Sequence, residues 1–273
     1  MPELPEVENV KNTLSRLIIG KTIKQVEIRW ENIIKLPEPE EFITRLKGQT
    51  VERIERRGKF LKIICSEDTI VSHLRMEGRY GLFQKEEPAD KHTHVFFEFE
   101  DGTELRYRDV RKFGTMHLFP KGTEDQFLPL SKLGAEPLSE EFTPKLMKQS
   151  FQKTNRSIKA VLLDQQYITG LGNIYVDEAL HRAGIHPETP ASKLSLHRLK
   201  KLHHYIVAIL SEAVEKGGST IRSYVNSVGE QGSFQLTLYV YGRAGQSCRS
   251  CGREIVRTVV AGRGTHICQA CQK

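Results

Sequence analysis

The sequence predicts an α+β chain with an N-terminal antiparallel β-sandwich, a helical region after it, and a zinc-bound β-hairpin at the C-terminus. Three observations lead to this prediction. Short stretches of alternating polar and apolar residues fill the first 120 residues, helical periodicity dominates from residue 140 to residue 216, and four cysteines lie in the last 26 residues. At 273 residues the chain suits more than one domain. We expect domains at 1–130, 131–236 and 237–273.

The first expected element is an amphipathic helix that would hold the N-terminus in place. Apolar residues recur at helical spacing before Gly20, at Leu4, Val7, Val10, Leu14 and Leu17. Strand-like stretches follow, and the Asp101-Gly102 pair between two of them is a hairpin turn signal. We expect strands at residues 22–29, 50–55, 60–65, 69–74, 94–100, 104–107 and 115–119. Packed as two antiparallel layers, these strands would form the sandwich.

The loop-like stretch 121–137 contains the expected hinge, and helical patterns follow it. We expect helices at residues 140–152, 157–163, 174–183 and 194–216. Between the second and third lies Thr169-Gly-Leu-Gly-Asn173, whose two glycines predict a helix–two-turn–helix motif. Such a loop lets backbone amides approach a phosphate closely, although a loop that only packs two helices explains it equally well. Residues 217–235 contain four glycines and show no period, which is typical of a functional lid or a disordered loop.

The chain carries a formal net charge of +7 at pH 7, with ordinary fractions of hydrophobic (38%) and charged (27%) residues. The last 33 residues hold six basic side chains against one acidic side chain, and so contribute +5 of that charge. This distribution favours an anionic partner, nucleic acid foremost. No apolar run approaches the roughly 20 residues of a membrane helix, and the N-terminus lacks a signal-peptide pattern. We therefore expect a cytoplasmic protein with no membrane partner.

Four of the five cysteines form the pattern C-x2-C-x16-C-x2-C, at Cys248, Cys251, Cys268 and Cys271. Two thiolate pairs on tight turns can close a tetrahedral zinc site. Because protein ligands would fill all four positions, this zinc would be structural. Two disulfides are the alternative, which a cytosolic location disfavours. Cys65 ends an apolar run and is expected to be a buried packing residue.

The second residue suggests covalent catalysis. Once Met1 is removed, Pro2 presents a secondary amine that can attack a sugar C1′ or an aldehyde and give a charged iminium. An α-amino group titrates near ~8, so part of it is unprotonated at neutral pH. Glu3 and Glu6 lie close in sequence and could carry protons. The alternative is that Pro-Glu simply suits the first turn of a helix.

Together these features resemble the formamidopyrimidine-DNA glycosylases, which are bacterial enzymes of base-excision repair. The likeness runs from Met1 to Lys273 and includes six motifs that are specific only in combination. The motifs are Pro-Glu-Leu-Pro-Glu-Val at 2–7, Arg-Arg-Gly-Lys-Phe at 56–60, His-Leu-Arg-Met-Glu-Gly-Arg-Tyr at 73–80, Asp-Val-Arg-Lys-Phe-Gly at 109–114, Gly-Leu-Gly-Asn-Ile-Tyr at 170–175 and Gly-Arg-Gly-Thr-His at 262–266.

The resemblance implies a bifunctional DNA glycosylase and AP lyase that excises oxidised purines, chiefly 8-oxoguanine and formamidopyrimidines, and then cuts the strand by β,δ-elimination. Pro2 would attack C1′ of the lesion nucleotide, and Glu3 would protonate the deoxyribose ring oxygen. Glu6 would position groups or move protons. Lys59 would contact the phosphate beside the lesion. By sequence alone, a solvated charge at a strand end is the better explanation of Lys59. Arg263 would grip phosphate and take part in the second elimination.

The resemblance also implies how the DNA would be held. Flipping the damaged base out of the duplex leaves a hole. Met76, Arg111 and Phe113 would fill it, although by sequence alone Met76 and Phe113 suit a core better. Further DNA contacts would come from His73, His92, Asn155, Asn173 and Tyr241. The base pocket would comprise Glu77 and, from the lid at 217–235, Ser219, Ile221, Arg222, Ser223 and Tyr224.

Two alternatives compete with this interpretation. The nearest is the sister group that resembles endonuclease VIII, which removes oxidised pyrimidines with the same terminal proline. The void-filling set described above favours the purine branch. The other alternative is a zinc-dependent DNA-binding protein without catalysis, and only the set Pro2, Glu3 and Lys59 argues against it.

The resemblance implies one structural zinc ion and no catalytic metal or organic cofactor. The expected partner is double-stranded DNA that contains an oxidised base or an abasic site. The protein is expected to act as a monomer in the bacterial cytoplasm, in association with the nucleoid. Asn155 stands where relatives often carry lysine, so we expect that phosphate contact to be weaker or to come from Lys153 or Arg156.

Overall fold

The computed structural model of the chain describes residues 1–219, 227–229 and 232–273. Four residues predicted for the base pocket, Ile221, Arg222, Ser223 and Tyr224, lie outside these ranges. The chain forms two compact units, one of residues 1–131 and 217–233 and the other of residues 132–216 and 234–273. The described part of the expected lid thus belongs mainly with the first unit, whereas the C-terminal hairpin belongs with the helices.

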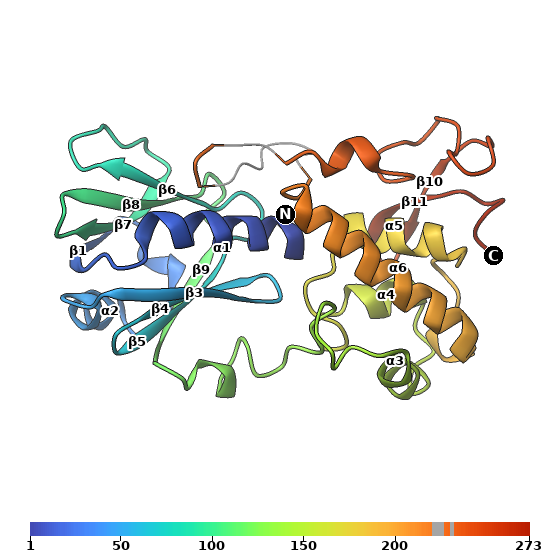
Figure 1. Ribbon diagram of the computed structural model, residues 1–273, viewed down its shortest axis with the longest axis horizontal. Helices are drawn as coiled ribbons and strands as arrows, with labels where there is room; N and C mark the ends of the chain where they lie inside the picture. The colour runs from blue at the N-terminus through green and yellow to red at the C-terminus, as the bar shows by residue number, and fades with distance from the viewer. Residues whose placement is uncertain (220–226, 230–231) are drawn as a thin grey trace. The chain divides into compact units, whose positions relative to one another are not determined.

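The first unit is a β-sandwich, as predicted (Figure 1). One sheet has four strands, in the order β1 (Ile23–Ile28), β7 (Thr93–Phe99), β8 (Thr103–Arg108) and β6 (Arg79–Gln84). The other has five strands, in the order β2 (Ile34–Leu36), β9 (Thr115–Pro120), β5 (Asp68–His73), β4 (Phe60–Cys65) and β3 (Val51–Arg57). Neighbouring strands run antiparallel, except that β2 pairs with β9 in parallel.

Helix α1 (Leu4–Ile18) confirms the amphipathic helix that the spacing predicted. In its apolar stripe Leu4, Val7 and Leu14 are fully buried. The helix contacts β3 and β4 of one sheet and β6 of the other. The hydrophobic core of the first unit therefore fixes the start of the helix, where the predicted catalytic residues lie.

Two strands and one α-helix of the first unit were not predicted, namely β2, β6 and helix α2 (Pro39–Leu46). Strand β2 has three residues, which is too short for periodicity to be recognised. Helix α2 begins at Pro39, soon after Pro37, and closely spaced prolines are more typical of a loop. Strand β6 contains Gly81, and glycine is unfavourable inside a strand. It nevertheless pairs with β8 along its whole length, so tertiary pairing outweighs local preference there.

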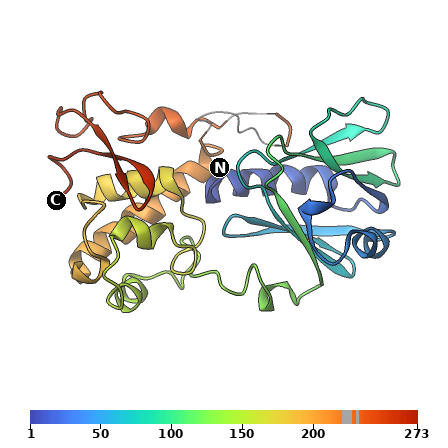
Figure 2. The ribbon, with the colours of Figure 1, turned by 180° about the vertical axis from the view of Figure 1, so that it is seen from behind.

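The second unit is helical and carries the C-terminal hairpin (Figure 2). Its helices are α3 (Pro144–Phe151), α4 (Ile158–Leu163), α5 (Asn173–Ala183) and α6 (Leu196–Glu215), and its hairpin is β10 (Val256–Val260) and β11 (Arg263–Ile267). Helix α5 packs against α4, α6 and β11. It ends at Gly184, whose φ of 70° is the left-handed conformation that glycine adopts easily. These elements confirm the predicted helix pair around the glycine-rich turn.

Short 3₁₀ helices complete the described chain: η1 (Glu31–Ile33), η2 (Glu124–Gln126), η3 (Ala191–Lys193) and η4 (Phe234–Thr237). None of the described helices combines the length and the apolar character that crossing a bilayer requires.

Candidate active site and zinc centre

Three of the predicted catalytic residues lie where α1 begins. Pro2, Glu3 and Glu6 are all buried. The Glu3 amide donates a hydrogen bond to Glu6 Oε2 at 2.8 Å, and the Val7 amide donates one to the Glu3 carbonyl at 3.1 Å. The first turn of the helix therefore fixes the backbone on which Pro2 and Glu3 lie next to each other.

Glu6 joins this helix start to the edge of the expected lid. The Ser219 amide and hydroxyl both donate to Glu6 Oε1, at 2.7 and 3.1 Å. Gly218, which precedes Ser219, has a left-handed backbone conformation with φ of +82°. A methyl group on Gly218 would lie 2.8 Å from Glu6 Oε1. Both oxygens of Glu6 thus hold backbone in place, which makes Glu6 an anchor for the site.

Lys59 lies in the two-residue turn between β3 and β4. Gly58 opens the turn at φ +58°, a conformation that favours glycine in a tight hairpin. Arg56 donates from Nη1 to the Gly58 carbonyl at 2.9 Å and from Nε to Glu8 Oε2 at 2.7 Å. Burial opposes ionisation of Glu8, yet the hydrogen bonds from Lys11 and Arg56 hold its pKa below the usual value. An ionic bridge through Glu8 therefore ties the Lys59 turn to α1.

His73 ends β5 and is held as a neutral ring. Its Nδ1 accepts a hydrogen bond from the Arg75 amide at 2.9 Å, and its ring meets Phe60 edge-on with centroids 4.6 Å apart. Burial, together with the nearby charges of Arg75 and Lys59, lowers the pKa of His73 to about 3. Because Nδ1 is an acceptor, the proton lies on Nε2, which is the donor that a phosphate oxygen requires.

Replacing His73 with glutamine is expected to make the fold less sensitive to acid. Histidine in an unfolded chain titrates near ~6.5, whereas folded His73 titrates at about 3. The unfolded state binds the extra proton between these values, so wild-type stability falls as the pH drops through this window. From pH 7 to pH 5 this group alone removes about 2 kcal/mol from the free energy of unfolding, and the glutamine variant should not show that loss.

Urea unfolding at the two pH values measures the difference. His197→Gln is the matched control, because His197 is exposed and should behave as the wild type does. Equal losses in the wild type and in His73→Gln would show that His73 does not stay neutral.

Two loops of the sandwich expose the predicted void-filling residues. Met76 lies between β5 and β6, and Arg111 and Phe113 lie between β8 and β9. Met76 is 39% exposed and Phe113 51% exposed, so neither belongs to the core that sequence alone would have favoured. The Arg111 guanidinium carbon lies 4.7 Å from the centroid of the Phe113 ring. The two loops therefore expose two apolar side chains and one cation to solvent.

Two further predicted residues border these loops. Glu77 is half-buried and follows Met76. The His92 carbonyl accepts a hydrogen bond from the Asp109 amide at 2.9 Å, and the His92 amide donates to Asp90 Oδ1 at the same distance. His92 is thus tied by its backbone to the start of the loop that carries Arg111.

In the second unit, α5 and the hairpin bring Asn173 and Arg263 close together. Asn173 is the first residue of α5, and its Nδ2 donates to the Gly264 carbonyl at 2.8 Å. Arg263 opens β11 and is exposed. The turn before it contains Ala261 and Gly262 at φ of 51° and 70°, so Arg263 follows directly on the tip of the hairpin. Asn155 lies apart from this contact, with Oδ1 accepting a hydrogen bond from Ser192 at 2.7 Å.

Tyr241 is held by a buried carboxylate that sequence reasoning missed. Glu178 Oε1 accepts hydrogen bonds from the amides of Val240 and Tyr241, each at 2.9 Å, and Glu178 Oε2 accepts one from the Tyr239 amide at 2.9 Å. Burial raises the pKa of Glu178 against these hydrogen bonds. The Tyr241 ring meets His266 of β11 with centroids 4.9 Å apart. Helix α5 therefore sets the position of Tyr241 beside the hairpin.

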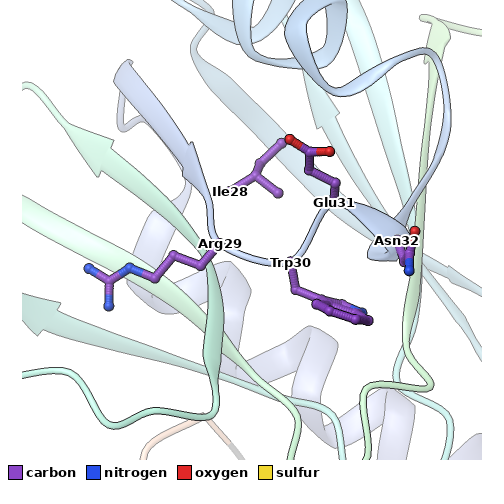
Figure 3. A pocket seen from close by; sticks show the side chains of 5 residues that line it. All are labelled: Ile28, Arg29, Trp30, Glu31 and Asn32. Carbon is purple, nitrogen blue, oxygen red and sulfur yellow. The ribbon is translucent and has the colours of Figure 1, made fainter.

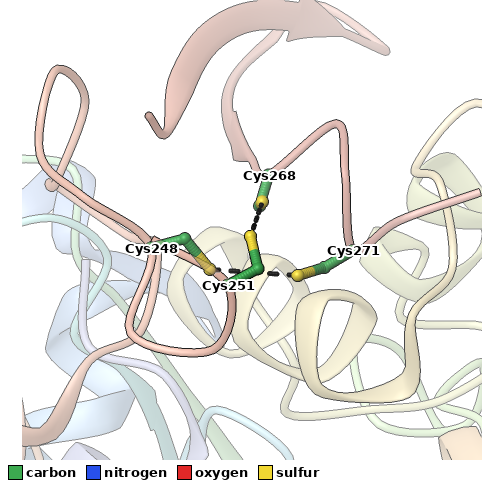
Figure 4. A group of neighbouring side chains, drawn as sticks. All are labelled: Cys248, Cys251, Cys268 and Cys271. Atoms are coloured by element: carbon green, nitrogen blue, oxygen red, sulfur yellow. Dashed lines mark hydrogen bonds between the residues drawn. The ribbon is translucent and has the colours of Figure 1, made fainter. Parts of the chain in front are cut away.

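The four predicted metal ligands converge in the same unit (Figure 4). Their sulfur atoms all lie within 4.8 Å of one another, with Cys251 and Cys268 3.4 Å apart and Cys248 and Cys271 3.9 Å apart. Zn–S bonds of about 2.3 Å in a tetrahedron separate the sulfurs by about 3.8 Å. These four cysteines are free thiols, so the alternative of two disulfides is wrong. The donor set fits one structural zinc ion.

The first unit also has a pocket with a separate lining (Figure 3). Its lining comes from the end of β1 and the turn after it, at Ile28, Arg29, Trp30, Glu31 and Asn32. None of the predicted site residues that the structure describes is among them. A single short segment lines this pocket, so side chains from separate elements do not converge there as they do at the sites above.

Comparison with known proteins agrees with this geometry along the whole chain. Residues 1–116 match a sequence model of the formamidopyrimidine-DNA glycosylase N-terminal domain, and residues 133–225 match the model of its H2TH domain. Residues 245–273 match a zinc finger found in FPG and IleRS. The formamidopyrimidine-DNA glycosylase of Cytobacillus firmus is 61% identical over 273 residues, which cover 100% of both chains. The chain belongs to the formamidopyrimidine-DNA glycosylase family. The Bacillus subtilis (strain 168) member of the family is 60% identical, over 100% of this chain and 99% of its own.

Solved structures of the formamidopyrimidine-DNA glycosylase family share the fold. A complex of Lactococcus lactis Fpg (MutM) with DNA that contains N7-benzyl-Fapy-dG matches with a TM-score of 0.94 and 41% identity, over 100% of both chains. A complex of the same enzyme with abasic-site DNA also gives a TM-score of 0.94, over 99% of each chain. The zinc-finger match and the cysteine cluster together establish one structural zinc in this member of the family.

A buried ion pair that sequence reasoning missed supports the hairpin. Lys159 of α4 is fully buried, and its Nζ donates to Asp177 Oδ1 at 2.6 Å and to Thr265 Oγ1 at 2.8 Å. Asp177 Oδ2 accepts a hydrogen bond from the His266 amide at 2.9 Å. Two helices are therefore joined to the strand that begins at Arg263. The signal in the sequence that could have indicated this ion pair is the lysine inside the otherwise apolar run at 158–163.

Replacing Lys159 with methionine is expected to lower the free energy of unfolding of the second unit by about 3–5 kcal/mol, because Asp177 is left charged and buried without its lysine partner. Changing Asp177 to leucine in the same protein should recover part of the loss, since the buried charge is then removed as well. Lys145→Met on α3 is the control, because Lys145 is exposed. Chemical denaturation measures the three variants; a loss no larger than that of Lys145→Met would contradict the assigned role.

Proposed function

We infer that this protein is a DNA glycosylase of base-excision repair that excises oxidised purines from double-stranded DNA and then cleaves the strand as an AP lyase. The observation that supports this most directly is the buried helix start that carries Pro2 and Glu3 in a chain that matches the family from end to end. The positively charged C-terminal segment suits a polyanionic partner.

The proposed chemistry starts from the secondary amine of Pro2 after Met1 is removed. The amine attacks C1′ of the damaged nucleoside, the bond from C1′ to the base nitrogen breaks, and the base leaves with a proton. The sugar opens to an iminium between Pro2 and C1′. Loss of a C2′ proton then expels the 3′ phosphate, and loss of a C4′ proton expels the 5′ phosphate. Water finally hydrolyses the iminium, which releases the sugar fragment as an aldehyde and frees the Pro2 amine. The zinc takes no part in these steps.

The neighbouring side chains have separate proposed roles. Glu3 gives a proton to the deoxyribose ring oxygen as the sugar opens. Glu6, which holds the Glu3 and Ser219 amides, positions the helix start rather than moving protons itself. Lys59 places a cation against the phosphate beside the lesion, held by the turn that Gly58 and Arg56 support.

The proposed DNA contacts combine both units. The neutral His73 ring donates from Nε2 to a phosphate oxygen, and Asn173, Tyr241 and Arg263 form a second phosphate-binding group on α5 and the hairpin. Arg263 also assists the second elimination. His92 and Asn155 are assigned to the flanking backbone. Glu77 and Ser219 belong to the proposed pocket for the flipped base, together with Ile221, Arg222, Ser223 and Tyr224.

The exposed set of Met76, Arg111 and Phe113 supports oxidised purines, rather than oxidised pyrimidines, as the substrate. These residues fill the space that the flipped base leaves, and Arg111 hydrogen-bonds the orphaned partner base. We further propose that the protein acts as a monomer in the cytoplasm and associates with the nucleoid. Sedimentation of the purified protein tests the first of these points, because a dimer would appear at twice the mass.

The test of the proposed substrate compares excision from 8-oxoguanine:C and thymine-glycol:A duplexes. Faster cutting of the 8-oxoguanine duplex is expected. Faster cutting of the thymine-glycol duplex would move the protein to the pyrimidine-removing group that resembles endonuclease VIII. Binding of both duplexes with cutting of neither, by protein that lacks Met1, would leave a DNA-binding protein without catalysis.

A further inference from the structure

One buried tyrosine lies against both loops that expose the proposed void-filling residues. Tyr107 of β8 is fully buried. A methyl group on Gly114 would lie 1.7 Å from the Tyr107 hydroxyl oxygen, and a methyl group on Gly78 would lie 2.2 Å from it. Gly78 closes the loop that carries Met76, and Gly114 closes the loop that carries Phe113. The hydroxyl is therefore packed closely against two loops that are far apart in the sequence.

A buried carboxylate fixes the path of the second loop. Asp109 is fully buried. Its Oδ1 accepts a hydrogen bond from the Arg111 amide at 3.0 Å, and its Oδ2 accepts hydrogen bonds from the amides of Phe113 and Gly114 at 2.9 and 2.8 Å. Three amides on one carboxylate leave the loop little freedom.

Each loop also contains a residue in an unfavourable backbone conformation. Arg75 and Lys112 adopt φ of 53° and 57°, in the left-handed region that residues with a side chain rarely occupy. The Arg75 amide donates to His73 Nδ1, and Lys112 Nζ lies 3.8 Å from the centroid of the Trp30 ring. Such conformations persist where surrounding contacts hold them, and they are common where a loop has a functional task.

We propose that Tyr107 and Asp109 are positioning residues for base extrusion: they hold the loops of Met76, Arg111 and Phe113 in the arrangement that enters the duplex as the damaged base leaves. This inference rests on the proposed function, because only an enzyme that takes a base out of the stack has a space to fill. Side chains that are already ordered enter without the loss of freedom that flexible loops would suffer. Neither residue touches the reacting atoms.

The experiment separates extrusion from chemistry with two substrates. Single-turnover rates are measured on an 8-oxoguanine:C duplex, in which a stacked base must be extruded, and on the same duplex with an abasic site, in which no base remains. The variants are Tyr107→Phe and Asp109→Asn. The control is Tyr80→Phe, because Tyr80 is a buried tyrosine whose ring lies 5.0 Å from that of Tyr107 and whose hydroxyl donates to Ser72 at 2.7 Å rather than facing the loops.

Both test variants are expected to lower 8-oxoguanine excision by on the order of 10- to 100-fold relative to abasic-site cleavage, since small misplacements of positioned groups have effects of this size. Tyr80→Phe should leave that ratio at the wild-type value, and thermal melting identifies variants that are folded. An unchanged ratio in a folded Tyr107→Phe or Asp109→Asn, or an equal drop in Tyr80→Phe, would overturn the proposal. Wild-type protein that processes neither substrate would refute the proposed function instead.

Discussion

Replacing Glu3 with glutamine is expected to slow base excision by on the order of 100- to 10,000-fold, the range that a positioned general acid contributes. Glutamine has nearly the same shape and keeps a polar atom at the same place, but it cannot supply a proton to the sugar ring oxygen. The backbone of Glu3, which donates to Glu6 and accepts from Val7, is not altered by the change. Affinity for lesion DNA should therefore stay at the wild-type value.

Single-turnover excision and equilibrium binding on one 8-oxoguanine duplex measure both quantities. Glu31→Gln serves as the control, because it makes the same change at an exposed carboxylate of the first unit. If Glu3→Gln excised the base at nearly the wild-type rate, the proton would have to come from another group. If affinity fell together with the rate, Glu3 would be a binding residue instead.

Removing the zinc is expected to unfold the C-terminal hairpin and to weaken DNA binding by on the order of 100-fold at physiological salt, because cationic contacts to phosphate are lost with it. Metal affinity at such a site is folding energy. The Cys248 and Cys268 side chains that hold it are buried against Val240 and Ile255, so the metal organises a small core. Cys268→Ser, which breaks the ligand set, should reproduce the effect of a chelator.

Zinc content, measured by metal analysis, and duplex affinity are to be compared in the wild type, in Cys268→Ser and in Cys65→Ala. Cys65 is a buried cysteine of the sandwich outside the metal cluster, so its variant should keep both the zinc and the affinity. Full DNA affinity in zinc-free protein would show that the hairpin does not need the metal to bind.

The sequence predicted elements well where the local pattern is clear. Helix α1 and the helix pair around Thr169–Asn173 follow from apolar spacing and glycine turns, and the cysteine spacing alone identified the metal cluster. Strand β2 was missed because three residues show no readable period, and helix α2 because the prolines at its start are typical of a loop. Their positions are decided by the sheet and core that they join, which local sequence does not describe.

The candidate site shows a similar division. The spacing and chemistry of Pro2, Glu3 and the cysteines can be read from the chain, whereas the exposure of Met76 and Phe113 cannot, because an apolar side chain looks the same in a core and on a surface. The buried partners Lys159 and Asp177 lie 18 residues apart and were not paired in advance. Only the packing of α4, α5 and β11 brings them together and buries both charges.

The measurement that tests the account most directly is borohydride reduction of the protein with abasic-site DNA, followed by mass mapping of the cross-linked peptide. Reduction traps an iminium between the enzyme and C1′ as a stable amine. Protein that lacks Met1 is expected to form the adduct, with the DNA attached at Pro2. An adduct mapped to a lysine such as Lys59, or active protein that forms none, would contradict the central role given to the Pro2 nitrogen.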